Sequence, residues 1–154
     1  MLDFAKALPP ELHVLIVAAI PVIELRGAIP LGLHLGLPPL EALGLAWAGT
    51  LAPIPLLYHL LLPGVALLKR TRLLRRVTVA YVTRSERQSL RIKRYGLPGL
   101  ILFVSIPFPV TGAWTGCLIA LLLGYSLRKT VFAIGVGSLV AGVIVTGLAR
   151  LAVG

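Results

Sequence analysis

The sequence predicts an all-helical integral membrane protein with two re-entrant helical hairpins, each followed by a transmembrane helix. Three observations lead to this fold class. The 154 residues are 58% hydrophobic and 13% charged, with a mean hydropathy of +0.97, whereas soluble domains carry about 25% charged residues. Four apolar stretches cover residues 12–37, 40–68, 97–127 and 131–149, and prolines interrupt the first and third. Basic residues are concentrated between the two halves.

The fourth stretch is the plainest transmembrane helix. Residues 131–149 contain no charge and would be about 28 Å long as a helix, which matches the hydrocarbon core of a bilayer. Residues 40–68 are also long enough to span, but they contain three prolines. We expect a kinked or tilted helix there, broken near Pro63-Gly64.

The interrupted stretch 97–127 is better explained as a hairpin than as a single crossing. One crossing needs about 20 residues and two need about 40, so its 31 residues fit neither. The basic pairs 93–94 and 128–129 flank it. A hairpin that enters and leaves by one face keeps both pairs in the cytoplasm, as the positive-inside rule favours.

The stretch 12–37 has the same build, with a broken segment between Pro21 and Pro30. If residues 40–68 run inward, the first hairpin opens outside and the second opens inside, which is an inverted-topology repeat. We therefore predict one transmembrane domain over 1–154. Its parts are a first repeat over 9–68, a basic helix over 69–95 and a second repeat over 96–154.

The basic helix accounts for most of the net charge of +10. Ten of the fifteen Lys and Arg residues lie between Lys69 and Arg94, with Glu86 as the one acid among them. Membrane proteins collect such residues in cytoplasmic loops, so we favour this interpretation over nucleic-acid binding. Four apolar residues share one helical face: Leu73, Val77, Ala80 and Tyr81. We expect an amphipathic helix on the anionic lipids of the inner leaflet; a solvated basic linker is the alternative.

The first hairpin carries a charge pair, Glu24 and Arg26, in an otherwise mostly apolar segment. Ionisable groups at membrane depth cost roughly 2.5–3.5 kcal/mol each on insertion scales, so they usually line a site or pair with each other. We predict that Glu24 couples transport to protons and that Arg26 binds a substrate anion or pairs with Glu24. Pro21, Gly27 and Pro30 form the tip around the pair. The alternative is a static pair that clamps this tip to its partner.

The second hairpin tip is uncharged. Its candidate residues are two prolines, two threonines, a glycine and a tryptophan: Pro107, Pro109, Thr111, Gly112, Trp114 and Thr115. The prolines open the helix, and the threonines supply hydroxyls. A helix starting near Gly112 would direct its positive end toward the midplane, where it can bind an anion.

The remaining residues favour no cofactor, metal site or enzyme. Cys117 is the only cysteine, and neither a metal-ligand spacing nor a nucleophile–base pair is visible. Small residues recur every four positions in two places, Gly44-Ala48-Ala52 and Ser138-Gly142-Thr146. They indicate close helix contacts, either within one chain or between two copies in a homodimer.

The segments 23–32 and 107–116 together resemble the small multidrug export family of prokaryotic membrane proteins. That family is similar to the wider DedA superfamily, whose members share paired re-entrant hairpins followed by spanning helices. Resemblance to DedA proteins implies proton-coupled transport, or movement of lipids such as polyprenyl phosphates between leaflets. Glu24 stands where a DedA-like hairpin carries an acid, whereas the second tip lacks the arginines that DedA hairpins contribute.

We therefore expect proton-coupled export of small amphipathic or cationic compounds through a midplane site between the two tips. One alternative is a lipid or polyprenyl-phosphate flippase or scramblase, in which Arg26 and the helix start at Gly112 hold the phosphate. Another is a non-transporting scaffold whose basic helix binds anionic lipid or a partner. The expected location is the cytoplasmic (inner) membrane of a prokaryote, crossed more than once, with residues 69–94 and 128–129 on the cytoplasmic side.

Overall fold

The computed structural model describes residues 8–21, 23–70, 75–108 and 111–153, and all regular structure among them is helical. The predicted all-helical fold class is thus confirmed for these residues. In chain order the helices are α2 (Pro10–Ala19), α3 (Glu24–His34), α4 (Pro39–Leu51), α5 (Ile54–Arg70), α6 (Arg75–Lys93), α7 (Gly96–Ser105), α8 (Ala113–Leu122) and α9 (Leu127–Val153).

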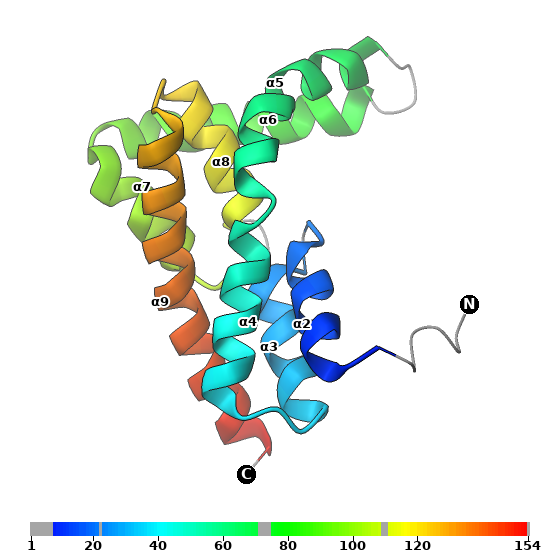
Figure 1. Cartoon of the computed structure of the whole chain (residues 1–154). Coiled ribbons are helices and arrows are strands. Elements are labelled where there is room, and N and C mark those ends of the chain that lie inside the picture. The colour runs from blue at the N-terminus through cyan, green and yellow to red at the C-terminus, as the bar shows by residue number, and fades with distance from the viewer. Residues whose placement is uncertain (1–7, 22, 71–74, 109–110, 154) are drawn as a thin grey trace.

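Helices α2 and α3 form the first hairpin, in the lower half of Figure 1. Pro10 occupies the first turn of α2, where its missing N–H costs nothing. The prediction that the backbone is broken from Pro21 to Pro30 is wrong. The interruption ends before Glu24, and Pro30 lies inside α3, on its exposed side.

Helices α7 and α8 form the second hairpin, in the upper half of Figure 1. The predicted interruption at Pro107 is confirmed, because α7 ends at Ser105 and α8 begins at Ala113, with Gly112 as its N-cap. Pro109, also predicted for this tip, lies outside the described residues. The hairpins point in opposite directions, so their turns meet in the interior (Figure 1).

Within the described ranges, two helical segments are long and apolar enough to cross a membrane, namely Pro39–Leu61 and Leu127–Ala152. The first combines α4 with the start of α5. The predicted break near Pro63 is wrong, because α5 continues through that proline and the irregular residues between α4 and α5 are Ala52 and Pro53. The second is most of α9, which runs from beside the second hairpin down to the C-terminal end of the molecule (Figure 1).

Two hydrophobic cores are stacked along α9. The lower core joins the first hairpin to α4 and α9 through Val14, Ala18, Leu25, Ile29, Ala46 and Ala141. The upper core joins the second hairpin to α5 and α9 through Ile54, Leu100, Val104, Ile119 and Ile134. Because α9 contributes to both cores, it fixes the two hairpins relative to each other.

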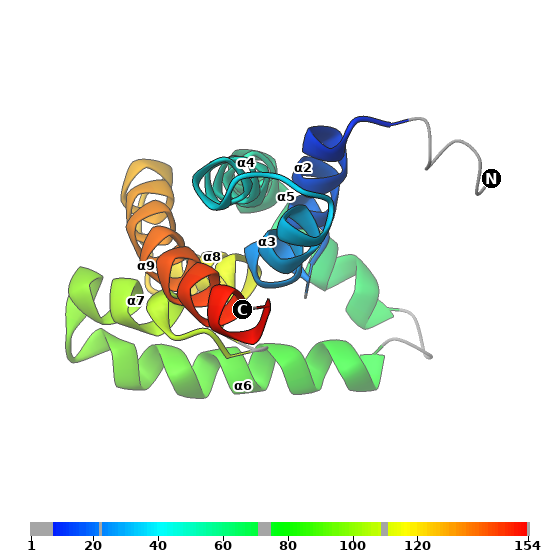
Figure 2. The same cartoon turned by 90° about the horizontal axis from the view of Figure 1, so that it is seen from below.

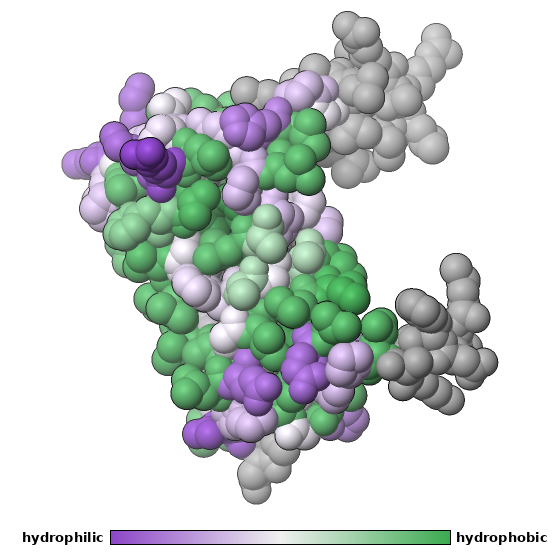
Figure 3. Space-filling model, viewed as in Figure 1, coloured by the Kyte–Doolittle hydropathy of each residue, from purple (hydrophilic) through white to green (hydrophobic). Residues whose placement is uncertain are grey.

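The outer surface of α9 is apolar. Its exposed large side chains include Phe132, Leu139, Val143, Ile144 and Leu148. In Figure 3 hydrophobic residues cover most of the middle of the molecule, and hydrophilic residues gather toward its two ends. This distribution suits a protein surrounded by lipid chains.

Helix α6 runs crosswise to α9 along the second hairpin (Figure 2). The predicted apolar face is wrong in part, because Ala80 is exposed and the buried stripe is Val82, Ser85, Ser89 and Ile92. Serine suits this stripe because each hydroxyl donates to a carbonyl of its own helix, Ser85 to Tyr81 and Ser89 to Glu86. The side chains of Leu73 and Val77 lie outside the described residues.

The two stripes of small residues have different surroundings. Ser138 and Gly142 are buried, and a Cβ added at Gly142 would collide with Leu43 of α4, so the second stripe makes contacts within the chain. Gly44 is exposed and has nothing within 4 Å of an added Cβ. The first stripe therefore faces outward, and a homodimer through it stays a prediction.

Candidate functional site

The two hairpin turns meet at Glu24, the first residue of α3. Its side chain is buried, with the residue only 3% exposed. Carboxylate Oε1 accepts a hydrogen bond from the backbone N–H of Trp114, in the first turn of α8, at 3.2 Å. A Cβ added at Gly112 would collide with both carboxylate oxygens, so only glycine lets α8 start this close to Glu24.

The backbone of Glu24 is unusual for a side-chain-bearing residue. Its φ is +48°, in the left-handed region that favours glycine. Such a conformation costs on the order of 1–3 kcal/mol and persists only where the surroundings enforce it. Residues two apart on a regular helix point to different faces. The left-handed residue at the helix start lets Glu24 and Arg26 both reach the second hairpin.

Arg26 contacts the turn of the second hairpin at the end that follows α7. Its Nη2 donates to the carbonyl oxygen of Ile106 at 3.1 Å and to Thr111 Oγ1 at 3.3 Å. Thr111 in turn closes the turn, with its hydroxyl 2.6 Å from the Ile106 oxygen and 3.0 Å from the Phe108 oxygen. Ile106 is the C-cap of α7, so Arg26 lies at the C-terminal end of that helix.

The two charges also face each other, with Arg26 Nη1 at 3.8 Å from Glu24 Oε2. Each one stands at the helix end of opposite sign, because a helix carries a partial positive charge at its N-terminus and a partial negative charge at its C-terminus. Glu24 therefore stabilises the start of α8, and Arg26 stabilises the end of α7. The geometry is that of a clamp between the hairpins, and it explains how the second tip can lack charges of its own.

The other predicted tip residues are divided between the contact and its surroundings. Pro21 is exposed in the first turn, and Pro107 is half-buried in the second. Gly27 lies in α3, where an added Cβ would collide with Ile23 of its own segment. Trp114 takes part through its backbone, which residue type does not reveal.

Thr115 is buried and contacts Tyr81, a residue that the sequence analysis did not assign to the site. Its hydroxyl lies 2.8 Å from the hydroxyl of Tyr81 on α6. Burial raises the pKa of the Tyr81 phenol above its ordinary value of 10.0, an effect that the hydrogen bond to Thr115 opposes in part. The basic helix therefore touches the first turn of α8, one residue beyond the Glu24 contact. The presence of a tyrosine in a basic helix was the one feature of the sequence that could have indicated this contact.

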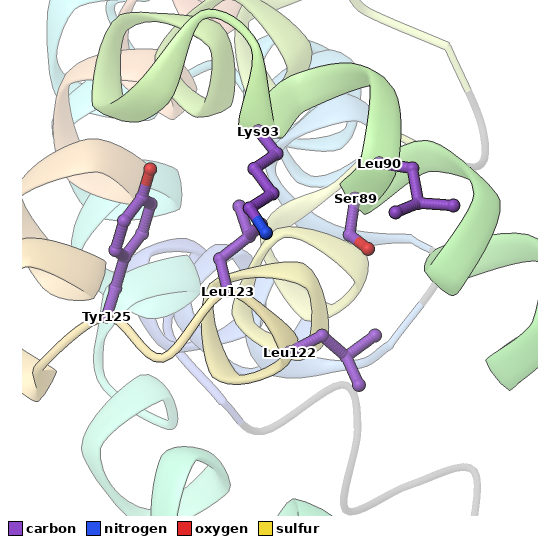
Figure 4. A pocket seen from close by; sticks show the side chains of 6 residues that line it. All are labelled: Ser89, Leu90, Lys93, Leu122, Leu123 and Tyr125. Atoms are coloured by element: carbon purple, nitrogen blue, oxygen red, sulfur yellow. The ribbon is translucent and has the colours of Figure 1, made fainter.

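Two clefts that described residues line open beside α6, and neither of the two includes Glu24 or Arg26. One, of about 410 Å³, is lined by Ala80, Thr83, Arg84 and Arg87. The other, of about 330 Å³, lies between α6 and the end of α8 (Figure 4). In it Lys93 and Ser89 extend from α6 toward Leu122 and Leu123. Both clefts contain basic groups, and the second also has leucines in its wall.

A metal site has no support in the described part of the chain, where no group of three or more His, Cys, Asp or Glu side chains could hold an ion. Comparison with known families gives a match over residues 24–144 to the family described as Putative small multi-drug export protein. No curated protein and no solved structure matches the chain. The matched residues begin at Glu24, directly after the turn of the first hairpin, and include the whole second hairpin.

Proposed function

The chain belongs to the small multi-drug export protein family, and we propose that it exports small amphipathic or cationic compounds in exchange for protons that bind Glu24. The description of that family as export proteins supports membrane transport rather than catalysis. The proposal adds the coupling ion, the substrate class and the pathway between the two hairpin turns.

One observation carries the proposal: Glu24 is a buried acid at the contact that closes the molecule between its hairpins. A hydrogen bond to a charged group contributes about 1.5–3 kcal/mol, and each 1.4 kcal/mol is tenfold in an equilibrium. Protonation removes the charge that holds both Trp114 N–H and Arg26. It therefore favours separation of the turns by up to roughly a hundredfold, so that proton binding shifts the balance between closed and parted turns.

The arrangement of the helices supports a pathway through this contact. With Pro39–Leu61 and Leu127–Ala152 as membrane spans, the hairpins enter from opposite faces and stop where their turns meet. They would then be re-entrant hairpins of an inverted repeat, in which broken helices meet at the midplane. Parting of the turns would open the site alternately to the two sides.

The position of α6 supports contact with anionic lipids on the cytoplasmic face. Its basic side chains are exposed, among them Arg76, Arg84, Arg87, Arg91 and Lys93. Each basic residue near an anionic leaflet contributes about 1 kcal/mol of attraction. The cleft between α6 and the end of α8 offers a place where a lipid phosphate can approach Lys93 while its chains remain against leucines (Figure 4).

The same contact argues against transport of phosphate lipids through this site. The helix start at Gly112, which the sequence suggested for a phosphate, already holds the Glu24 carboxylate. A phosphate would have to displace that carboxylate and remain beside it as a like charge. A cationic substrate is attracted by Glu24, and it takes the place of Arg26, whose Nη1 lies 3.8 Å from Glu24 Oε2.

Transport in proteoliposomes with an imposed pH gradient tests the proposal. We expect the wild-type protein to move a fluorescent organic cation in the direction opposite to the flow of protons. Glu24→Gln should abolish the dependence of this transport on the pH gradient. Glu41→Gln is the matched control, because Glu41 is an exposed acid in the first turn of α4. Gradient-driven transport that persists in Glu24→Gln would refute proton coupling at this residue.

A further inference from the structure

The acceptors around Arg26 form a compact cluster at the end of α7. The carbonyl oxygen of Ile106 and the hydroxyl of Thr111 both accept from Arg26 Nη2, at 3.1 and 3.3 Å. The carbonyl oxygen of Phe108 lies 3.0 Å from that hydroxyl. These oxygens stand at the negative end of a helix dipole and include no carboxylate.

From this geometry we infer that the Ile106–Thr111 acceptor cluster is a cation-binding site, which Arg26 fills while the turns are together. A guanidinium or primary ammonium group of the substrate binds there once Arg26 has left. That the bound cation is a transported substrate rests on the proposed function, whereas the cation site itself does not depend on it.

The fit of Arg26 supports its role as a replaceable occupant. Its Nε is buried and makes no hydrogen bond to any described residue, so part of its donor capacity is unused. A buried donor without a partner costs about 1–3 kcal/mol. A free guanidinium can orient all its N–H groups without the constraint of a tether, so it can donate to the same oxygens once Arg26 has left them.

The surroundings of the cluster define the rest of the ligand. Ile106 and Phe108 are exposed large hydrophobic residues on either side of Pro107. Apolar parts of an amphipathic cation can contact them while its charged group lies on the oxygens. A quaternary ammonium ion has no N–H to donate to these oxygens, so the site discriminates against it.

Chemical rescue of Arg26→Ala tests the inference. This variant empties the cluster and keeps its acceptors. We expect millimolar guanidinium chloride to raise its melting temperature by roughly 3 °C at ten times the dissociation constant. Equal concentrations of tetramethylammonium or sodium chloride should leave it unchanged, and wild type should respond to none of the three salts. An equal response of Arg26→Ala to the three cations, or no response to guanidinium, would overturn the site.

A second variant separates the cluster from the carboxylate. Arg26→Ala also leaves Glu24 unpaired, and a cation could act merely by neutralising it. The double variant Arg26→Ala, Thr111→Val keeps Glu24 but removes one acceptor, so we expect at least a tenfold weaker guanidinium response. A response of unchanged size assigns the rescue to Glu24 and refutes the cluster.

The test also stands if Arg26→Ala is too unstable to purify. Arg26→Met keeps the length of the stem, and binding of radiolabelled guanidinium can be measured in membranes without purification. Binding is measured without a pH gradient, so this result can be interpreted even if transport proves not to be coupled to protons. Coupled transport by the wild type together with absent binding in both variants refutes the cation site alone.

Discussion

The backbone N–H of Trp114 donates to the carboxylate of Glu24 across 3.2 Å, joining two helix ends that are 90 residues apart in the chain. This bond places the one acid of the α3 start on the positive end of α8. Arg26 repeats the relationship with opposite sign at the end of α7. The hairpins are thus held together by charges on one and helix dipoles on the other.

Gly112→Ala tests the close approach of α8 to Glu24. The added methyl group would overlap the carboxylate, so the turns must move apart. We expect a loss of about 1–3 kcal/mol in the free energy of unfolding, together with loss of transport. Thermal unfolding in detergent measures the first effect.

Gly44→Ala is the matched control for that substitution. Gly44 lies in α4 with nothing within 4 Å of an added Cβ. Alanine in a helix is favoured over glycine by about 0.5–1 kcal/mol, so this variant should be as stable as wild type or more stable. Equal stability of the two alanine variants would show that the carboxylate does not touch residue 112.

Thr111→Val tests the hydroxyl at the centre of the second turn. The substitution keeps the shape of the side chain but removes an acceptor for Arg26 and a donor to the turn carbonyls. We expect a loss of about 1–3 kcal/mol, measured by thermal unfolding. Thr146→Val should cost less, because that hydroxyl donates only to Gly142 of its own helix. If both variants lose the same stability, Thr111 has no special part in the contact.

Much of the hairpin architecture could be predicted from the sequence, because proline and glycine act locally. Pro107 ends α7, Gly112 precedes α8, and both effects depend on backbone sterics alone. Pro30 shows the limit of the argument. It lies inside α3 with its ring on the exposed side, although a proline there removes the hydrogen bond that residue 30 would donate to the carbonyl of residue 26.

The contacts of the site were less accessible to sequence analysis. Arg26 binds the carbonyl of Ile106, and Glu24 binds the N–H of Trp114; both partners are backbone groups, which every residue carries. The left-handed φ of Glu24 could not be predicted from the sequence either, since glycine is the residue that normally adopts this conformation. Residue types therefore identified the charges but not their partners.

Tyr81→Phe tests the link between the basic helix and the site. Loss of the hydroxyl removes the contact with Thr115 and should cost about 0.5–1.5 kcal/mol. Burial raises the pKa of the Tyr81 phenol above its ordinary value of 10.0, so the folded protein holds this proton more tightly than the unfolded chain. The stabilisation is therefore fully present below pH 10 and is lost as the pH rises through the raised pKa.

Melting temperatures of wild type and Tyr81→Phe across pH provide the measurement. We expect a constant difference between them from pH 7 to pH 9, and a smaller difference at higher pH. A difference that grows above pH 10 would contradict the assigned direction. No difference at any pH would show that the hydroxyl contact adds no stability.

Thr83→Cys tests the cytoplasmic position of α6. Thr83 is exposed beside Arg84 in one of the clefts, whereas Ser85 is buried and would escape any label. In a background in which Cys117 is replaced by alanine, a membrane-impermeant maleimide added to intact cells should not react at position 83 and should react after permeabilisation. His34→Cys, at the exposed end of α3 on the opposite side, should react in intact cells. The reverse pattern would invert the topology, and with it the side from which protons reach Glu24.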